Sequence, residues 1–264
     1  MSQRAPLFQV DAFTNTLFGG NPAAVVVLDD EFWPDNQLQQ VAAENNLAET
    51  AFLVRTDGRH LLRWFTPTLE VPLCGHATLA TGAVVLDQLE PGRDQVVFES
   101  ASGPLTVRRT EAAYLMDLPA RTATPTSAPP ELVDALGSAP TAVLVNQHNY
   151  LAVYDTAAAV RALTPDMAGL MRLDRLGVIV TAPGDGRFDF VSRYFAPRKG
   201  IPEDPVTGAA HCMLAPYWSG RLGKSEFSAH QASSRGGDLV CRTAGDRVEL
   251  EGACVFYLEG HITI

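Results

Sequence analysis

The chain has 264 residues, which is enough for one large domain or for two of about 130 residues each. Its composition, 46% apolar and 19% charged, is typical of a folded globular protein and excludes a disordered chain. No stretch approaches the roughly 20 apolar residues that a membrane-spanning helix needs. The net charge is −10 and the 20 Lys and Arg residues are scattered, so the sequence carries no basic footprint for nucleic acid.

The four cysteines indicate a reducing environment rather than a disulfide framework. None forms a C-x-x-C pair, and they lie in apolar or Gly-containing contexts, as reduced intracellular thiols do. The opening also runs into its first strand-like segment without the apolar h-region of a signal peptide. We therefore expect a cytoplasmic protein with neither a zinc site nor disulfides.

Short strand-like runs fill the first half of the chain, separated by Gly, Pro, Asn or Asp. They are predicted at 8–13, 23–28, 50–54, 61–65, 95–99, 105–108 and 114–118. Two helices interrupt them, one over 36–45 behind Asp35 as its N-cap, and one over 77–89. The second helix is almost entirely apolar up to Leu86, and a helix that is apolar all round must be buried on all sides.

A Pro-, Ser- and Thr-rich stretch from Arg121 to Pro130 suits a connection between domains. Strand-like segments resume after it at 142–145, 151–154, 178–181, 188–194, 239–242, 248–250 and 255–258. A second apolar helix is predicted over 208–218, where Pro216 should kink the helix or end it early. We expect two domains, 1–120 and 121–264, with the final strand able to return toward the first half.

The two halves resemble each other locally. Arg63-Trp64-Phe65-Thr66-Pro67, then Pro72 and Cys74, matches Arg193-Tyr194-Phe195-Ala196-Pro197, then Pro202 and Asp204, at one offset (204 − 74 = 130). Each copy enters an apolar helix through a Gly-containing turn, which favours duplication over chance similarity. We expect an α+β fold of two pseudo-symmetric halves, each a mostly antiparallel sheet rolled around one buried helix. The helix N-termini are then expected to face a shared cleft and to attract an anion.

Glu49 is the strongest candidate for acid–base chemistry. It lies between small and apolar neighbours where a predicted helix meets a strand. Partial burial of such a carboxylate favours a group that can take and return a proton. The alternative is a salt-bridged or solvated glutamate at the edge of a strand, and the local context does not decide between the two.

Three further residues lie at the predicted helix starts. His76 can donate a hydrogen bond to a substrate or relay a proton there, although a structural role is its alternative. Asp204 corresponds to Cys74 in the second half, where it can cap the Thr207 turn or receive a hydrogen bond from a substrate. Cys74 can be a thiol base near a helix end or a buried structural cysteine, and His211 is expected to pack in the core.

Searches for other catalytic signatures fail. The chain has no G-x-G-x-x-G that opens a βαβ unit, no G-x-x-x-x-G-K-[ST], no G-x-S-x-G and no H-E-x-x-H. We therefore expect no nucleotide, flavin or metal cofactor.

Taken together, the motifs resemble the PhzF-like family of phenazine-biosynthesis isomerases, which share the diaminopimelate epimerase fold. The resemblance spans 9–211 in the family's order and spacing. It is carried by Gln9-Val10-Asp11-Ala12-Phe13-Thr14, Gly19-Gly20-Asn21-Pro22-Ala23-Ala24-Val25, Leu47-Ala48-Glu49-Thr50-Ala51-Phe52, Phe65-Thr66-Pro67, Val71-Pro72-Leu73-Cys74-Gly75-His76-Ala77-Thr78 and Glu203-Asp204-Pro205-Val206-Thr207-Gly208-Ala209-Ala210-His211.

This resemblance implies two "hot-dog"-like halves, a cofactor-independent proton shift on a small carboxylate- or carbonyl-containing substrate, and commonly a homodimer. It implies that Glu49 shuttles the proton while His76 and Asp204 bind and polarise the substrate. Substrate-binding positions implied at the helix starts are Gly75, Ala77, Gly208 and Ala209. In the related epimerases two cysteines at the helix N-termini transfer the protons. Cys74 matches one of them, but Asp204 stands in the place of the other.

The chain departs from the family pattern at Ala209, where the family commonly has Ser after Thr-Gly. The backbone N–H of Ala209 can still contact an anion, but a hydroxyl donor is missing, and a hydrogen bond to a charged group is typically worth about 1.5–3 kcal/mol. A small carboxylate other than the phenazine precursor is at least as plausible a substrate. Two rival functions remain, a racemase or epimerase that uses Cys74 with Glu49 or Asp204, and a non-catalytic small-molecule-binding protein.

Overall fold

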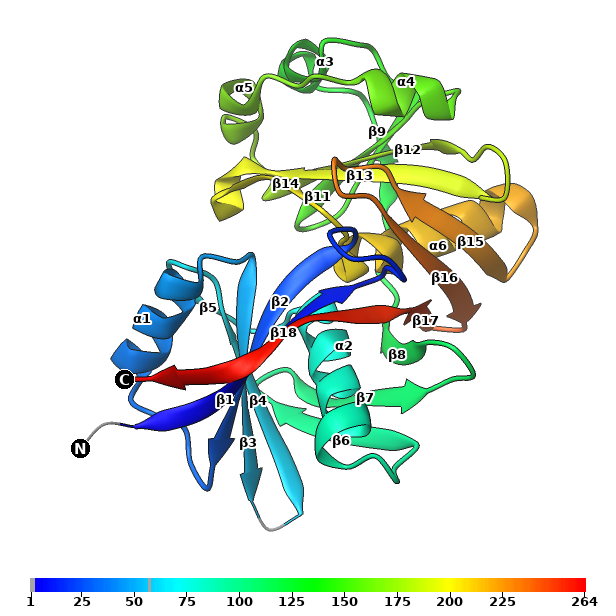
Figure 1. The fold of residues 1–264 in the computed structure, drawn as a ribbon. Coiled ribbons are helices and arrows are strands. Elements are labelled where there is room, and N and C mark those ends of the chain that lie inside the picture. Colours follow the sequence, from blue (N-terminus) through cyan, green and yellow to red (C-terminus); the bar gives the residue numbers. More distant parts are fainter. Residues whose placement is uncertain (1–2, 57) are drawn as a thin grey trace. The chain divides into compact units, whose positions relative to one another are not determined.

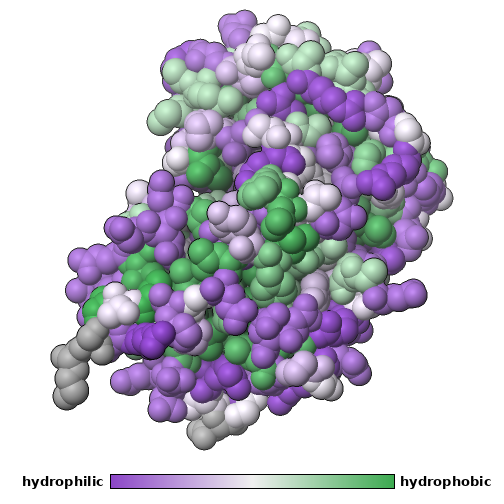
Figure 2. All heavy atoms as spheres, viewed as in Figure 1, coloured by the Kyte–Doolittle hydropathy of each residue, from purple (hydrophilic) through white to green (hydrophobic). Residues whose placement is uncertain are grey.

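The structure is a computed structural model that describes residues 3–56 and 58–264, so Met1 and Ser2 lie outside the described residues. The chain divides into two compact units, and each is a sheet with helices packed on it (Figure 1). Unit 1 comprises Met1–Leu118 and Glu251–Ile264, and unit 2 comprises Pro119–Leu250. No helix among the described residues is long and apolar enough to cross a membrane. Hydrophilic side chains are spread over the visible face of both units (Figure 2).

Unit 1 contains two helices followed by a short π-helical turn, and its strands pair mostly antiparallel. The parallel pairs are β2 with β3 and β4 with β6. The elements are β1 (Arg4–Ala12), β2 (Asn21–Asp29), α1 (Asp35–Asn45), β3 (Glu49–Thr56), β4 (Arg59–Phe65), β5 (Glu70–Val71), α2 (Gly75–Val84), η1 (Val85–Leu89), β6 (Gln95–Ser100), β7 (Gly103–Arg109), β8 (Tyr114–Pro119) and β18 (Cys254–Thr263).

Unit 2 repeats this pattern, with β11 parallel to β12 and β13 parallel to β15. Its elements are β9 (Thr124–Thr126), α3 (Pro130–Leu136), β10 (Ala142–Val145), β11 (Asn149–Val153), α4 (Ala157–Ala162), α5 (Met167–Met171), β12 (Gly177–Pro183), β13 (Phe190–Ala196), η2 (Pro197–Lys199), β14 (Ile201–Asp204), α6 (Gly208–Leu222), β15 (Glu226–Gln231) and β16 (Gly237–Ala244). β17 (Arg247–Gly252) runs across the division between the units. The predicted mixture of helices and mostly antiparallel strands is confirmed.

A buried helix lies at the centre of each unit. Every residue of α2 after Gly75 is buried, because its small apolar side chains fit closely against β1, β2, β3 and β7. Gly82 allows this approach, since a Cβ there would lie 2.4 Å from a methyl group of Val107. In α6 the first two turns are buried except for Ala209, and the stacked rings of Trp218 and Phe190 extend this core.

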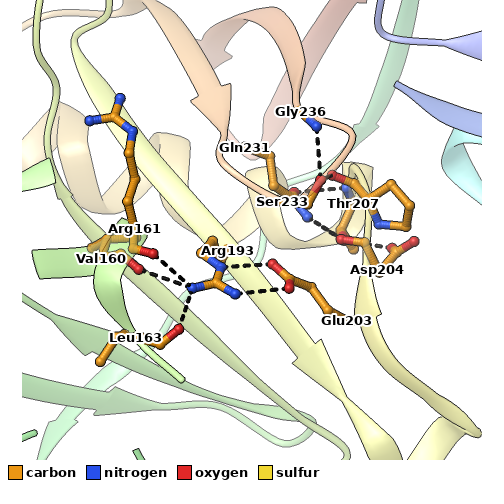
Figure 3. Close-up of polar contacts among 11 residues, drawn as sticks. Val160, Arg161, Leu163, Arg193, Glu203, Asp204, Thr207, Gln231, Ser233 and Gly236 are labelled. Atoms are coloured by element: carbon orange, nitrogen blue, oxygen red, sulfur yellow. Dashed lines mark hydrogen bonds and ion pairs between the residues drawn. The ribbon is translucent and has the colours of Figure 1, made fainter. Parts of the chain in front are cut away.

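An arginine–glutamate pair recurs at the same place in both units. In unit 1 the Nε and Nη2 atoms of Arg63 on β4 donate to the two carboxylate oxygens of Glu70, at 2.8 and 2.7 Å. In unit 2 Arg193 on β13 donates in the same bidentate way to Glu203, at 2.8 and 2.9 Å (Figure 3). Each guanidinium also lies over the phenylalanine two residues further along its strand. The shared geometry supports the duplication inferred from the sequence.

The offset between the two halves is not constant, however. It is 130 between Arg63 and Arg193 but 133 between Glu70 and Glu203, and the helices begin at Gly75 and Gly208, again 133 apart. The N-cap of α2 is Cys74 and the N-cap of α6 is Thr207. The expectation that Asp204 takes the place of Cys74 was therefore wrong. The three extra residues lie between Arg193 and Glu203, so Asp204, four residues before Gly208, takes the position that Val71 has before Gly75.

Pro216 does not end the second buried helix, which continues to Leu222. A proline lacks the N–H that would bond the carbonyl four residues earlier, here that of Cys212. The backbone N–H of Arg121 donates to this carbonyl at 2.9 Å. An incoming segment of chain thus satisfies the acceptor that the proline leaves open, and the predicted early end was wrong.

One further local expectation was wrong. Asp35 is the first residue of α1 rather than its N-cap, which is Pro34; the Asp35 carboxylate instead accepts a hydrogen bond from Arg63. The Pro-, Ser- and Thr-rich stretch at 121–130 begins close to the division between Leu118 and Pro119, and it contains β9, which pairs with β10. Extended polar residues with prolines can form a short edge strand as well as a linker.

Candidate functional site

Three of the predicted residues meet in unit 1 where β3 and α2 begin. Glu49 is the first residue of β3, Cys74 is the N-cap of α2, and His76 is the second residue of that helix. The Glu49 Oε2 atom lies 3.3 Å from the His76 Nε2 atom, and the Cys74 Sγ atom lies 3.5 Å from His76 Nδ1. The side chains of His76 and Glu49 are 5% and 16% exposed. The structure therefore brings the predicted proton-transfer residue and the predicted histidine into direct contact.

The backbone around Glu49 explains its placement. Helix α1 ends at Asn45 and is capped by Asn46, whose left-handed conformation (φ 49°) reverses the chain direction. After two further residues β3 begins beside β2, with Glu49 opposite Ala23 in the parallel register. Because Glu49 is the first residue of an otherwise buried strand, its carboxylate lies at the end of the strand rather than in the core.

His76 is held as a neutral imidazole by its surroundings. Burial lowers its pKa from the ordinary 6.5 to about 3, against a smaller opposing effect of the Pro22 carbonyl. A protonated ring would place a cation in the apolar interior of unit 1, away from water. Near neutral pH His76 is thus a hydrogen-bonding group rather than a positive charge.

The start of α2 offers backbone donors beside these side chains. The first amides of a helix have no acceptor within the helix and carry the positive end of its dipole. The N-cap, Cys74, makes no side-chain capping hydrogen bond. Of the predicted binding residues in this turn, Gly75 is partly exposed and Ala77 is fully buried, so Ala77 can take part only through its backbone.

Glu49, Cys74 and His76 also form a group of metal-ligating side chains. One carboxylate oxygen, the thiol sulfur and one imidazole nitrogen all lie within 4.8 Å of one another. Three such ligands with one open position are typical of catalytic zinc sites, so the donor set is chemically able to hold a zinc-like cation. The sequence analysis expected no metal, and the spacing of the three residues along the chain contains no zinc motif.

The second predicted cluster lies in unit 2, before the start of α6. The Asp204 Oδ2 atom accepts a hydrogen bond of 2.6 Å from the Thr207 hydroxyl. Gln231 on β15 joins the same turn, donating to the Asp204 carbonyl at 2.7 Å and accepting from the Thr207 N–H at 2.9 Å (Figure 3). Asp204 is 7% exposed and Gln231 is fully buried. The turn that carries Asp204 is therefore fixed by a neutral side chain from another strand.

The remaining predicted residues of unit 2 take different positions. Gly208 is the buried first residue of α6, and Ala209, the second, is partly exposed. His211 is fully buried and its Nδ1 lies 2.9 Å from the Thr207 carbonyl, to which it must donate. Burial lowers the pKa of His211 to about 4, and its ring stacks on Phe190. His211 packs in the core, as expected.

Two polar residues of these clusters were not singled out from the sequence. Asn21, whose Nδ2 lies 3.1 Å from His76 Nδ1, was visible only as part of the Gly-Gly-Asn-Pro motif. Gln231 lies in β15, which the sequence analysis did not predict, and the alternation of Phe227, Ala229 and Gln231 as its buried residues was the available signal. A buried polar residue at an apolar strand position needs partners, and here those partners belong to the site.

Comparison with known proteins agrees with the arrangement in each unit. The family model described as phenazine biosynthesis-like protein (PhzC-PhzF) matches residues 10–260. An uncharacterized isomerase of Pseudomonas aeruginosa is 49% identical over 254 residues, covering 96% of this chain and 97% of the relative. The crystal structure of a PhzF-family phenazine biosynthesis protein from Enterococcus faecalis is 41% identical, covers 99% of this chain and 100% of its own, and has a TM-score of 0.95.

A more distant likeness identifies the fold. A hydroxyproline epimerase from Agrobacterium vitis, with 10% identity and a TM-score of 0.62, covers 99% of this chain and 93% of its own, which at this identity shows the fold alone. The expected diaminopimelate epimerase-like fold is confirmed. The chain belongs to the PhzC-PhzF phenazine biosynthesis-like family and is an isomerase of that family.

Proposed function

We propose that the protein catalyses a proton shift on a small carboxylate- or carbonyl-containing metabolite, with Glu49 as the group that moves the proton. The observation that carries this proposal is the contact between the carboxylate of Glu49 and the imidazole of His76 beside the start of α2. A carboxylate can accept a proton, while a neutral imidazole N–H and helix-terminal amides donate hydrogen bonds to negative charge.

The proposed reaction follows from these roles. Glu49 removes a proton from a carbon next to the carbonyl or carboxylate group, and the electron pair of the broken C–H bond moves onto that group. Donors from His76 and from the first turn of α2 stabilise the anion that results. Glu49 then returns a proton, which can exchange with solvent while it is on the carboxyl group, to a different carbon, so no oxidant, reductant or cofactor is consumed.

We propose that Asp204 serves the same reaction by holding a polar group of the substrate. Its support is the duplicated architecture, in which a buried helix starts next to each cluster, and the resemblance of the Asp-Pro-Val-Thr-Gly motif to the family pattern. Gly75, Ala77, Gly208 and Ala209 are proposed to bind the substrate through their backbone. Ala209 lacks the hydroxyl donor of the Ser that is common in the family. We therefore favour a substrate whose carboxylate needs fewer hydrogen bonds than that of the phenazine precursor.

A racemase that used Glu49 and Cys74 as two bases fits the geometry less well. Two bases on opposite faces of one carbon, each about 3–3.5 Å from it, must be about 6–7 Å apart. The acid–base atoms of Glu49 and Cys74 lie within 4.8 Å of each other. They can act on one face of a substrate, which agrees with a shift by a single base.

The test is turnover in heavy water, followed by NMR on a panel of small unsaturated amino and hydroxy acids. Glu49→Gln should lower turnover of an identified substrate by at least about 10²-fold, the lower range of general acid–base effects. Glu44→Gln is the matched control, because it removes the same charge from an exposed position on α1, five residues away. Full turnover by Glu49→Gln, with the fold intact, would sink the assignment.

The same assay separates the rivals and the remaining expectations. A protein that only binds its ligand would incorporate no solvent deuterium into it. We expect turnover to survive dialysis against a chelator, and loss of activity there would overturn cofactor independence.

We also propose a cytoplasmic homodimer, for which sedimentation should give twice the 28.4 kDa of one chain.

A further inference from the structure

The proton on the ring of His76 can occupy either nitrogen, and the neighbouring groups decide which. Asn21, the first residue of β2, is fully buried, and its Nδ2 lies 3.1 Å from His76 Nδ1. An amide nitrogen can only donate a hydrogen bond, so Nδ1 must accept through its lone pair. A neutral imidazole that accepts at Nδ1 carries its proton at Nε2.

This tautomer determines what His76 presents to Glu49. The Nε2 atom lies 3.3 Å from the Glu49 carboxylate. With the proton at Nε2, the ring offers that carboxylate, or a substrate anion beside it, an N–H donor. With the proton at Nδ1, two sets of lone pairs would face each other across 3.3 Å in a site with little water.

We propose that Asn21 is a positioning residue that fixes His76 in the Nε2–H tautomer, so that the ring acts as a donor during the proton shift. The inference rests on the proposed function for its catalytic consequence but not for the tautomer itself. In this role Asn21 acts on the reaction through His76.

The backbone places Asn21 firmly enough for this role. Asn21 pairs with Ala12 across β1 and β2. It follows Gly20, whose φ is +60° and where a Cβ would lie 2.1 Å from the Ala12 carbonyl oxygen. Only glycine fits such a turn without strain, which explains why a glycine precedes the asparagine.

Titratable groups in contact with the ring are Glu49 at Nε2 and Cys74 at Nδ1, and the Pro22 carbonyl is a further acceptor beside the ring. The Cys74 thiol lies 3.5 Å from Nδ1 and is a weak donor to it. Asn21 is closer, at 3.1 Å, and an amide is the stronger donor. The two contacts favour the same tautomer, and the larger contribution belongs to Asn21.

The first test needs no substrate. Long-range ¹H–¹⁵N NMR of histidine-labelled protein distinguishes protonated from unprotonated ring nitrogens, and the His76 signals are assigned by their loss in His76→Gln. We expect Nε2 of His76 to be protonated and Nδ1 unprotonated near pH 7. A proton on Nδ1 would overturn the proposal, whatever the protein's activity.

The second test moves the proton. In Asn21→Asp a carboxylate replaces the donor amide with almost the same shape, so the His76 proton should move to Nδ1 and turnover should fall by about 10²-fold. Asn149→Asp is the control, because Asn149 is also buried at the start of a strand but pairs with Tyr194; it should leave the His76 signals unchanged. Retention of the Nε2–H signal and full turnover in Asn21→Asp would refute the role.

The two tests also separate this inference from the proposed function. If Glu49→Gln keeps full turnover while the wild-type tautomer is Nε2–H, the proton-shift mechanism fails and the positioning of His76 stands. If Glu49→Gln is inactive while wild-type His76 carries its proton on Nδ1, the mechanism stands and the positioning role fails.

Discussion

The starts of the two buried helices are built on one plan but carry different chemistry. In unit 1 the helix follows Cys74 directly, and ionisable groups, Glu49 and His76, lie around its first turn. In unit 2 the N-cap is Thr207, whose hydroxyl donates to Asp204 and whose backbone N–H donates to Gln231. The first arrangement has groups that can move a proton, and the second has groups that hold one carboxylate in place.

The difference comes from the side chains at equivalent positions, because Val71 and Asp204 each lie four residues before the start of their helix. In unit 2 the side chain of Gln231 fixes the turn that follows Asp204. A duplicated frame can therefore keep its strands and helices while single side chains give each half its own chemistry.

The largest difference should appear when the shared arginine is replaced. Arg193 is 13% exposed and, besides Glu203, donates to the carbonyls of Val160, Arg161 and Leu163 at the end of α4 (Figure 3). Arg193→Met should lower the free energy of unfolding by about 3–5 kcal/mol, because it leaves a partly buried carboxylate and helix-terminal carbonyls without their cation.

The matched change in unit 1 should be mild. Arg63 is 24% exposed, and its partners Glu70 and Asp35 are 42% and 79% exposed, so water can replace the guanidinium. Arg63→Met should cost about 1 kcal/mol or less. Urea unfolding of the two variants measures both values. Equal losses of unfolding free energy would show that the two arginine–glutamate pairs do not differ as described.

Lowering the pH should have an intermediate effect on the free energy of unfolding. His76 and His211 are buried neutral, with pKa values lowered to about 3 and about 4. Below about pH 6.5 these two histidines bind protons in the unfolded chain but not in the folded chain. The free energy of unfolding is therefore highest above that pH and decreases as the pH falls. Each histidine should cost about 2 kcal/mol of stability between pH 7 and pH 5.

Unfolding at pH 7 and pH 5 tests whether the two units share this sensitivity. His76→Gln and His211→Gln should each flatten the pH dependence by a similar amount. A variant that left the slope unchanged would show that its histidine can be charged in the folded protein.

The smallest effect should come from the N-cap of α2, Cys74. Cys74→Ala removes a weak hydrogen bond to His76 and no proton-transfer group, so turnover should fall by less than about tenfold, the equivalent of about 1.4 kcal/mol. Steady-state kinetics measures this. A loss as large as that of Glu49→Gln would instead favour a thiol-dependent racemase or epimerase.

Much of the fold was predictable because local rules and global structure agree. The alternating and continuous apolar runs located most strands, and the all-apolar pattern after Cys74 located the buried helix α2. The three short helices of unit 2, α3 to α5, were not predicted, since segments of five to seven residues carry too little periodicity. The continuation of α6 through Pro216 depends on Arg121, almost 100 residues earlier, which no local pattern contains.

The site, too, was predictable where local sequence is informative and unpredictable where tertiary packing decides. Glu49 and His76 were predictable from short motifs, because a carboxylate and a histidine at element boundaries are informative by themselves. Their contact was not, since it joins β3 and α2 through tertiary packing. Asn21 and Gln231 act through other residues, and their roles become visible only when the partner of each hydrogen bond is known.

The return of the chain to unit 1 has a consequence for its biosynthesis. β1 pairs on one side with β2 and on the other with β18, from Arg4 opposite Thr263 to Ala12 opposite Cys254. During synthesis β1 therefore waits for β18, which follows it by about 250 residues, before its second edge is covered. Until β18 has been made, that edge remains open to pairing with other chains. Deletion of β18 should thus harm solubility more than its distance from Glu49 along the chain would indicate.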